Sequence, residues 1–181
     1  IHVGRTLDDG IYNLKTDLNT DKDIEVYGGY NYNGANVSIW QHTTGESRKW
    51  KITYDSATDS YTFINPFTNK ALDLYGGVAY NNANISIYDS NGSCAQRWKI
   101  VPRSDSNSYN ILSTCSLAYA LDVYGATSAD GSNIDLWETH SAASEKWHFK
   151  PVIQLIEDGN YNIVNTANLN AAIDVFGAYT S

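Results

Sequence analysis

The sequence predicts an all-β protein in which three four-stranded units close into one barrel capped by hairpins. Three observations predict it. A segment recurs along the chain at 21–40, 69–88 and 118–137. Around it, alternating runs rich in Val, Ile, Tyr and Trp are separated by clusters of Gly, Asn, Asp and Ser, which is the pattern of short strands joined by turns. No segment shows a helical period.

Each unit repeats the same strands in the same order. The first strand of a unit lies around a tyrosine, namely Tyr12, Tyr61 or Tyr109. The recurring segment supplies the second and third strands. The fourth strand begins at a tryptophan that is predicted to lie in the core, and these tryptophans are Trp50, Trp98 and Trp147. After a leader at 1–8, the units are expected at 9–59, 60–107 and 108–157.

The end of the chain begins a further copy. Tyr161 and the run "NAAIDVFGAYTS" at 170–181 match the first strands of a unit, but no closing tryptophan follows. Three complete units already close a barrel. Residues 158–181 are therefore interpreted as the opening of a second barrel, which makes the chain one module of a larger protein. An unpaired strand edge can recruit a neighbour, so self-association through this segment is also expected.

Composition and motifs exclude several classes of function. The net charge is −8 and no basic stripe appears, which argues against nucleic acid and anionic membranes as partners. No apolar run approaches the roughly 20 residues that span a bilayer. Nucleophile elbows, phosphate loops and metal-ligand spacings are missing, so no enzyme, cofactor or metal site is predicted. Cys94 and Cys115 either pair or are two buried thiols.

Alternation along the strands predicts a candidate site in every unit, because successive residues of a strand face opposite sides. Leu72 and Leu74 are expected to face the core, which turns Asp73 and Tyr75 outward. On the next strand of this unit, the residues expected to face outward are Ser86 and Tyr88. The equivalent residues are Glu25, Tyr27, Ser38 and Trp40 in the first unit and Asp122, Tyr124, Asp135 and Trp137 in the third.

A carboxylate beside exposed rings suits a sugar. The acid can accept hydrogen bonds from two neighbouring hydroxyls, and such charge-assisted bonds are stronger than neutral ones. An aromatic ring can cover the apolar C–H face of the pyranose. Each unit is therefore predicted to offer one glycan site.

The ordered set "ALDLYGG", an Asn-rich turn, "ISIY" and "QRW" in the second unit resembles the repeat of ricin B-type lectins. The resemblance covers residues 9 to about 157 and implies a β-trefoil that binds carbohydrate. It adds a polar sugar contact two residues before the closing tryptophan, where this chain has Gln96, Glu145 and Arg48.

The resemblance also bears on which sugar is bound. Galactose-binding lobes often carry an asparagine before that polar residue, but Ser47, Ala95 and Ser144 stand there, which argues against galactose in particular. Glu25 is one methylene longer than the usual aspartate. The first site is therefore expected to be the most altered of the three.

Alternative interpretations remain at this point. The main hypothesis is a non-catalytic lectin module of a secreted, bacterial-type enzyme or toxin, with the other domains of that protein as neighbours. The second is a receptor- or partner-docking domain of a multi-domain toxin with degenerate sugar sites, which the replaced glutamines favour. A β-trefoil protease inhibitor would leave the acid and aromatic pattern unexplained. The acids could also only hold their own turns.

Overall fold

The computed structural model describes residues 4–152, 164–165 and 168–172. Residues 4–152 form one twelve-stranded sheet. Its strands are β1 (Gly10–Thr16), β2 (Asn19–Val26), β3 (Val37–Gln41), β4 (Trp50–Asp55), β5 (Ser60–Asn65), β6 (Lys70–Leu74), β7 (Ala83–Tyr88), β8 (Trp98–Pro102), β9 (Tyr109–Ser113), β10 (Tyr119–Val123), β11 (Ile134–Glu138) and β12 (Trp147–Pro151). In the described part of the chain, no helix is long and apolar enough to cross a membrane.

Short 3-10 helices join the strands at equivalent places of the three lobes. After the second strand of each lobe come η1 (Tyr27–Gly29), η3 (Tyr75–Gly77) and η5 (Tyr124–Ala126). Before the fourth strand come η2 (Glu46–Arg48), η4 (Cys94–Gln96) and η6 (Ala143–Glu145). Both sets carry residues that were predicted to form the sites.

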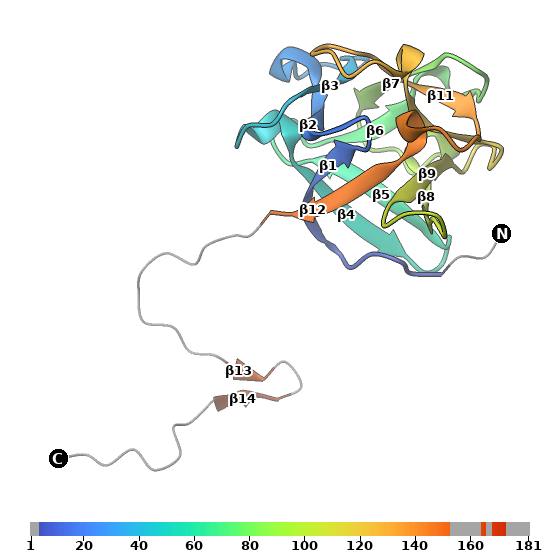
Figure 1. Ribbon diagram of the computed structural model, residues 1–181. Coiled ribbons are helices and arrows are strands. Elements are labelled where there is room, and N and C mark those ends of the chain that lie inside the picture. Colours follow the sequence, from blue (N-terminus) through green and yellow to red (C-terminus); the bar gives the residue numbers. More distant parts are fainter. Residues whose placement is uncertain (1–3, 153–163, 166–167, 173–181) are drawn as a thin grey trace.

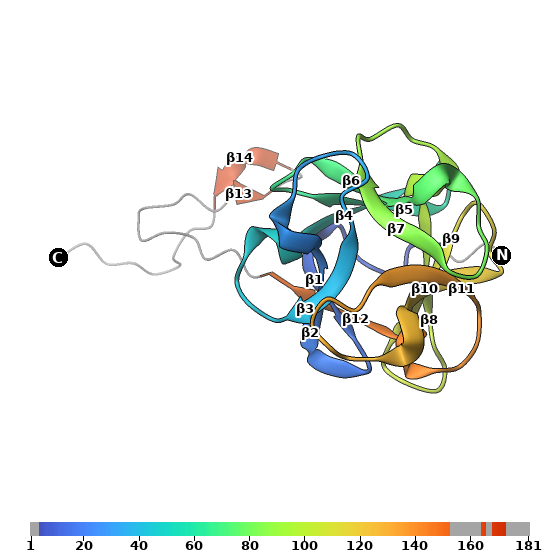
Figure 2. The same ribbon diagram turned by 90° about the horizontal axis from the view of Figure 1, so that it is seen from above.

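Six strands close a barrel. Strand β1 pairs with β12 and β4, β4 with β5, β5 with β8, β8 with β9, and β9 with β12, so the ring returns to its start (Figure 1). The other six form the hairpins β2–β3, β6–β7 and β10–β11. Seen from above, β3, β7 and β11 surround the centre of this cap (Figure 2). The predicted β-trefoil of three four-stranded repeats is confirmed.

Most of the expected fourth unit lies outside the described residues. Only β13 (Val164–Asn165) and β14 (Asn168–Ala172) are described there, and they pair with each other in a separate two-stranded sheet. The predicted second barrel at 158–181, and self-association through it, stay predictions.

The three tryptophans lie in the core as predicted. Trp50, Trp98 and Trp147 are fully buried, and each begins a closing strand. A buried indole N–H needs a partner. Each donates to a backbone carbonyl 26 residues earlier, on Ile24 at 3.1 Å, Leu72 at 3.3 Å and Leu121 at 3.0 Å. The closing strand is thereby tied to the strand that carries the candidate acid.

A ring of three asparagine side chains joins the lobes at the cap. Asn36 donates its Nδ2 to Oδ1 of Asn133 at 2.8 Å, Asn133 donates to Asn84 at 2.8 Å, and Asn84 donates to Asn36 at 3.0 Å. Each amide gives one hydrogen bond and accepts one, so the ring is closed. Equivalent residues of the three repeats thus stabilise one shared contact.

Asn84→Ala is expected to lower the free energy of unfolding by about 1–2 kcal/mol, because it leaves a donor on Asn133 and an acceptor on Asn36 without their partner. Urea unfolding measures the effect. Asn31→Ala, at an exposed asparagine, is the control and should change stability by less than about 0.5 kcal/mol. Equal stability of the two variants would show that the ring contributes nothing.

Cys94 and Cys115 form a disulfide with their Cα atoms 4.9 Å apart. The alternative of two buried thiols is therefore wrong. The bond ties η4 to the turn after β9. Since η4 also carries Gln96, the disulfide helps to fix one of the residues predicted to contact sugar.

Candidate functional site

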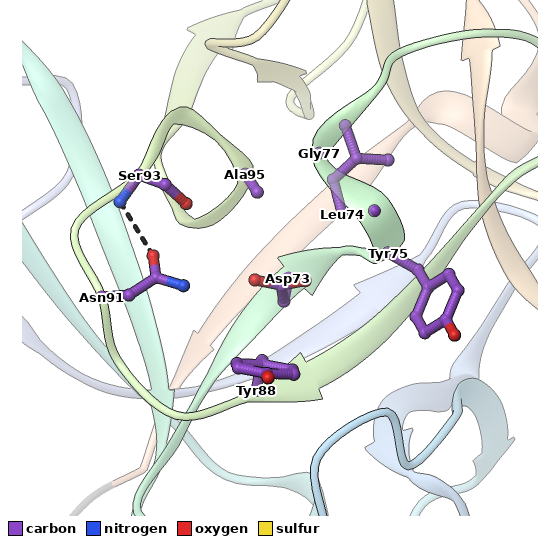
Figure 3. A pocket seen from close by; sticks show the side chains of 9 residues that line it. Asp73, Leu74, Tyr75, Gly77, Tyr88, Asn91, Ser93 and Ala95 are labelled. Carbon is purple, nitrogen blue, oxygen red and sulfur yellow. Dashed lines mark hydrogen bonds between the residues drawn. The ribbon is translucent and has the colours of Figure 1, made fainter.

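The second lobe contains an open hollow of about 360 Å³ whose floor includes Asp73. Tyr75, on η3, and Tyr88, at the end of β7, line it and are 62% and 42% exposed. Figure 3 shows Asp73 between Tyr88 and the turn that carries Ala95. The predicted acid and rings thus line one hollow, with the acid at its base and the rings open to solvent.

The side-chain amide of Gln96 fixes Asp73. Its Nε2 donates to Oδ2 of Asp73 at 2.9 Å and to the carbonyl of Asp89 at 3.0 Å, while its Oε1 accepts the backbone N–H of Asn91 at 2.7 Å. Burial raises the pKa of Asp73, and the bond from Gln96 opposes that rise. The chain therefore holds a partly desolvated carboxylate in one orientation.

A left-handed turn sets the direction of the Tyr75 ring. Gly76 follows with φ of 75°, a conformation that side chains rarely adopt. The chain therefore turns away directly after Tyr75, and the ring stands at the edge of the hollow (Figure 3).

The first lobe has a similar hollow of about 420 Å³, lined by Glu25, Tyr27, Trp40 and Arg48 among others. Arg48 takes the place of the glutamine, and its Nη2 lies 2.8 Å from Oε2 of Glu25. Burial raises the pKa of Glu25, and the guanidinium opposes that rise. The acid that would accept sugar hydroxyls is thus already paired with a cation.

The third lobe makes a different substitution. Glu145 stands in the place of the glutamine and is fully buried. Its Oε2 accepts the backbone N–H of His140 at 2.9 Å, as Gln96 does from Asn91 in the second lobe. Its Oε1 lies 2.6 Å from Nδ1 of His140. At these two equivalent positions, the third lobe has His140 where the second has Asn91, and Glu145 where the second has Gln96.

The acid and rings predicted for the third lobe resemble those of the second lobe in burial. Asp122 is buried, as Asp73 is, while Tyr124 and Trp137 are exposed. Burial raises the pKa of Asp122, and a hydrogen bond from Ser144 and the charge of His140 oppose that rise.

Six residues that were predicted to face outward are buried, so that part of the prediction was wrong for them; they are Glu25, Asp73, Asp122, Ser38, Ser86 and Asp135. Glu25 and Asp73 still line hollows, whereas neither hollow is lined by Ser38, Ser86 or Asp135. Alternation along the strands holds, but the outer face of β3, β7 and β11 is covered where the lobes meet at the cap. Neighbouring lobes join there in backbone bridges, such as Asn36 to Ser86.

Asp135 is the most unusual of these residues. It stands directly opposite Asp122 across β10 and β11, and neither of its carboxylate oxygens has a hydrogen-bond partner among the described residues. Burial and the charge of Asp122 raise the pKa of Asp135 to about 7.

The sequence matches the family model described as ricin-type β-trefoil lectin domain-like, over residues 2–88, 58–137 and 95–181. The chain belongs to this lectin family. Among curated protein sequences none matches it. As a member of this family, the chain contains a binding module of the lectin type.

Solved structures share the lectin fold. A designed threefold-symmetric protein, ThreeFoil, is 26% identical with a TM-score of 0.74, covering 80% of this chain and all of its own. A ricin B-like lectin from Macrolepiota procera, solved with lactose, is 15% identical with a TM-score of 0.70, covering 82% of this chain and 100% of its own. A mosquitocidal holotoxin is 21% identical with a TM-score of 0.77 over 92% of this chain, which spans only 20% of the toxin.

Sequence reasoning about this lectin missed two residues of the sites. Asn91 lies three residues after Tyr88, and His140 lies three residues after Trp137. The backbone N–H of each donates to the side chain two residues before the closing tryptophan, on Gln96 or Glu145. The equal offset in two repeats was the signal that could have identified them.

Proposed function

We propose that this chain is a non-catalytic lectin module that binds glycans through the hollow of its second lobe. The observation that carries the proposal is Asp73, held by Gln96 at the base of a hollow that Tyr75 and Tyr88 line. An ionised carboxylate can accept hydrogen bonds from two sugar hydroxyls, and an exposed aromatic ring can cover the C–H face of the pyranose. Because the amide of Gln96 fixes the acid before any ligand arrives, little order is lost on binding.

The other two lobes contribute less to this function. In the first, Arg48 competes with a sugar for Glu25. In the third, a glutamate replaces the glutamine beside Asp122. Each working site should be weak, with a dissociation constant on the order of millimolar, or about −4 kcal/mol. Binding by more than one lobe to a multivalent surface would then add avidity.

The module belongs to a larger secreted protein of bacterial type, an enzyme or a toxin, whose other domains are its neighbours. Two observations support this part of the proposal. The Cys94–Cys115 disulfide suits an oxidising compartment outside the cytosol. The chain also resembles one fifth of a mosquitocidal holotoxin, so a module of this fold occurs within a toxin.

A glycan array with the intact chain tests the function. Wild-type protein should bind a subset of glycans, and Asp73→Asn should lose most of that signal while keeping its melting temperature. Terminal galactose, N-acetylgalactosamine and sialylated galactose should all be displayed, because the chain lacks the asparagine often found in galactose-binding lobes. No signal for wild-type protein on any glycan would contradict the proposal.

A second candidate is a receptor- or partner-docking domain with degenerate sugar sites. The Glu25–Arg48 pair favours it, because it neutralises one acid of the repeat. This candidate predicts a silent array together with tight binding to a parent or receptor protein. The second lobe, which retains both acid and glutamine, favours the lectin.

The double variant Glu25→Asp, Arg48→Gln should give the first lobe the acid and amide of the second. It is expected to raise the number of bound disaccharides per chain by one, because the Arg48 cation no longer occupies the acid and Tyr27 and Trp40 already line the hollow. Calorimetric titration measures the stoichiometry. Conservative Lys51→Arg, at an exposed residue of β4, is the control, and an unchanged stoichiometry in the double variant would contradict this prediction.

A further inference from the structure

The third lobe brings together a histidine and two acids from three separate segments. Asp122 comes from β10, His140 from the loop after β11, and Glu145 from η6. One ligand atom of each lies within 4.8 Å of the other two. In the second lobe the equivalent residues are Asp73, Asn91 and Gln96. That set has one carboxylate and two neutral amides, whereas the third lobe has two carboxylates and an imidazole.

The cluster has more negative charge than its surroundings balance. Asp122, Asp135 and Glu145 are all more than nine-tenths buried. Oδ1 of Asp122 and both oxygens of Asp135 have no hydrogen-bond partner in the described part of the chain. The charge of Glu145 acts on Arg103, but the guanidinium of Arg103 donates its hydrogen bonds to Asp105 and Asn110 rather than to the cluster.

Buried charges are costly unless they are paired or bind a metal. Here His140 is the group that meets Glu145, and its side chain is 43% exposed, which gives an ion a route from solvent. Unpartnered carboxylate oxygens beside an accessible imidazole are the donors that a divalent cation uses.

We propose that the third lobe binds a divalent transition-metal ion, with Asp122, His140 and Glu145 as its ligands. One imidazole nitrogen and two carboxylates suit Zn²⁺, and three protein ligands leave a position for water or another small ligand. Calcium is disfavoured because it takes six to eight oxygen ligands. The inference departs from the sequence-based expectation of no metal site, because the residue spacing of 122, 140 and 145 fits no metal motif.

The other lobes show why only the third is proposed. In the first, Arg48 supplies the positive charge beside Glu25. In the second, Gln96 and Asn91 are neutral. His42 also contacts a buried acid, Asp23, but Lys15 already neutralises that acid at 2.8 Å.

Calorimetric titration of the chelator-treated chain with ZnCl₂, without sugar, tests the proposal. Wild-type protein should bind one ion. His140→Asn and Glu145→Gln should each weaken binding by about 100-fold or more, since loss of a supporting residue alone costs 10–100-fold. Both variants place the residue of the second lobe at the equivalent position, so the fold should accept them. Melting without metal checks that they fold.

His42→Ala is the matched control, because the His42 side chain is also 43% exposed and also lies against a carboxylate. It should bind zinc as wild-type protein does. Cobalt provides a second readout, since its visible absorption reports direct ligation and should vanish in His140→Asn. Failure of wild-type protein to bind, or equal binding by His140→Asn, would overturn the proposal. Neither result depends on glycan binding, so the proposed lectin function would stand or fall separately.

Discussion

Asp135→Asn is expected to raise the free energy of unfolding at pH 8 by about 4 kcal/mol in the presence of a chelator. In the wild-type chain both oxygens of this buried carboxylate lack hydrogen-bond partners among the described residues, and Asp122 lies directly opposite. Asparagine has nearly the same shape and no charge, and its amide can donate to Asp122. The variant therefore removes a buried repulsion without leaving a cavity.

The effect should depend on pH in one direction. Burial, followed by the charge of Asp122, raises the pKa of Asp135 from 3.8 to about 7 in the folded chain. The folded state therefore binds a proton on Asp135 more tightly than the unfolded state does. The stability that this protonated carboxyl contributes is fully present below pH 3.8 and is lost as pH rises to about 7. The variant should match wild-type protein at pH 4 and exceed it at pH 8.

Urea unfolding at pH 4, 6 and 8 measures this difference. Asp105→Asn provides a control of opposite sign, because Arg103 holds the pKa of Asp105 below its usual range. That variant should lose stability at pH 8 rather than gain it. A stability difference between Asp135→Asn and wild-type protein that stays constant across this pH range would contradict the account of the third lobe.

Asp73→Asn is expected to weaken glycan binding at the second lobe by about 100-fold, or about 2.7 kcal/mol. The substitution removes the charge that strengthens bonds from sugar hydroxyls and places an amide where Gln96 donates. Titration with a panel of mono- and disaccharides measures the change. Asp89→Asn, at an exposed acid of the same lobe that bonds Lys70, should leave affinity unchanged, whereas equal binding by wild-type and Asp73→Asn protein would remove Asp73 from the site.

The same site should respond to acid. Burial raises the pKa of Asp73, so the carboxylate takes up a proton at a higher pH than an ordinary aspartate does. Protonation removes one acceptor and the charge. Glycan binding should therefore decline on acidification before the exposed aspartates titrate.

The fold could be predicted from the sequence because its signals are local and repeated. The period of 48 and 49 residues between Trp50, Trp98 and Trp147 identified the lobes, and alternation around Leu72 and Leu74 assigned the core face. These features depend only on neighbours along the chain. They also placed each acid beside an exposed ring.

What could not be predicted comes from contacts between lobes. Ser86 and Asp135 alternate correctly along their strands, but neighbouring lobes cover them at the cap. The amide ring of Asn36, Asn84 and Asn133 likewise forms only when three repeats meet. Strand periodicity describes each lobe by itself and contains no information about these junctions.

The side chains that pair with the acids of the sites could not be predicted from the sequence either. The sequence placed Arg48 in the first site, but only the structure shows that its guanidinium pairs with Glu25. His140 reaches Glu145 across a loop whose conformation no strand pattern specifies. Equivalent positions of the three lobes therefore differ in charge far more than their shared motif suggests.

The most direct test maps a bound sugar onto the molecule by nuclear magnetic resonance. Titration of isotope-labelled protein with a disaccharide from the array should shift the backbone amides of Tyr75, Tyr88 and Asn91, around the hollow of the second lobe. The amides of the barrel strands should stay unchanged. Shifts confined to surfaces away from the candidate acids and rings of the three lobes would contradict glycan binding by the acid and the rings.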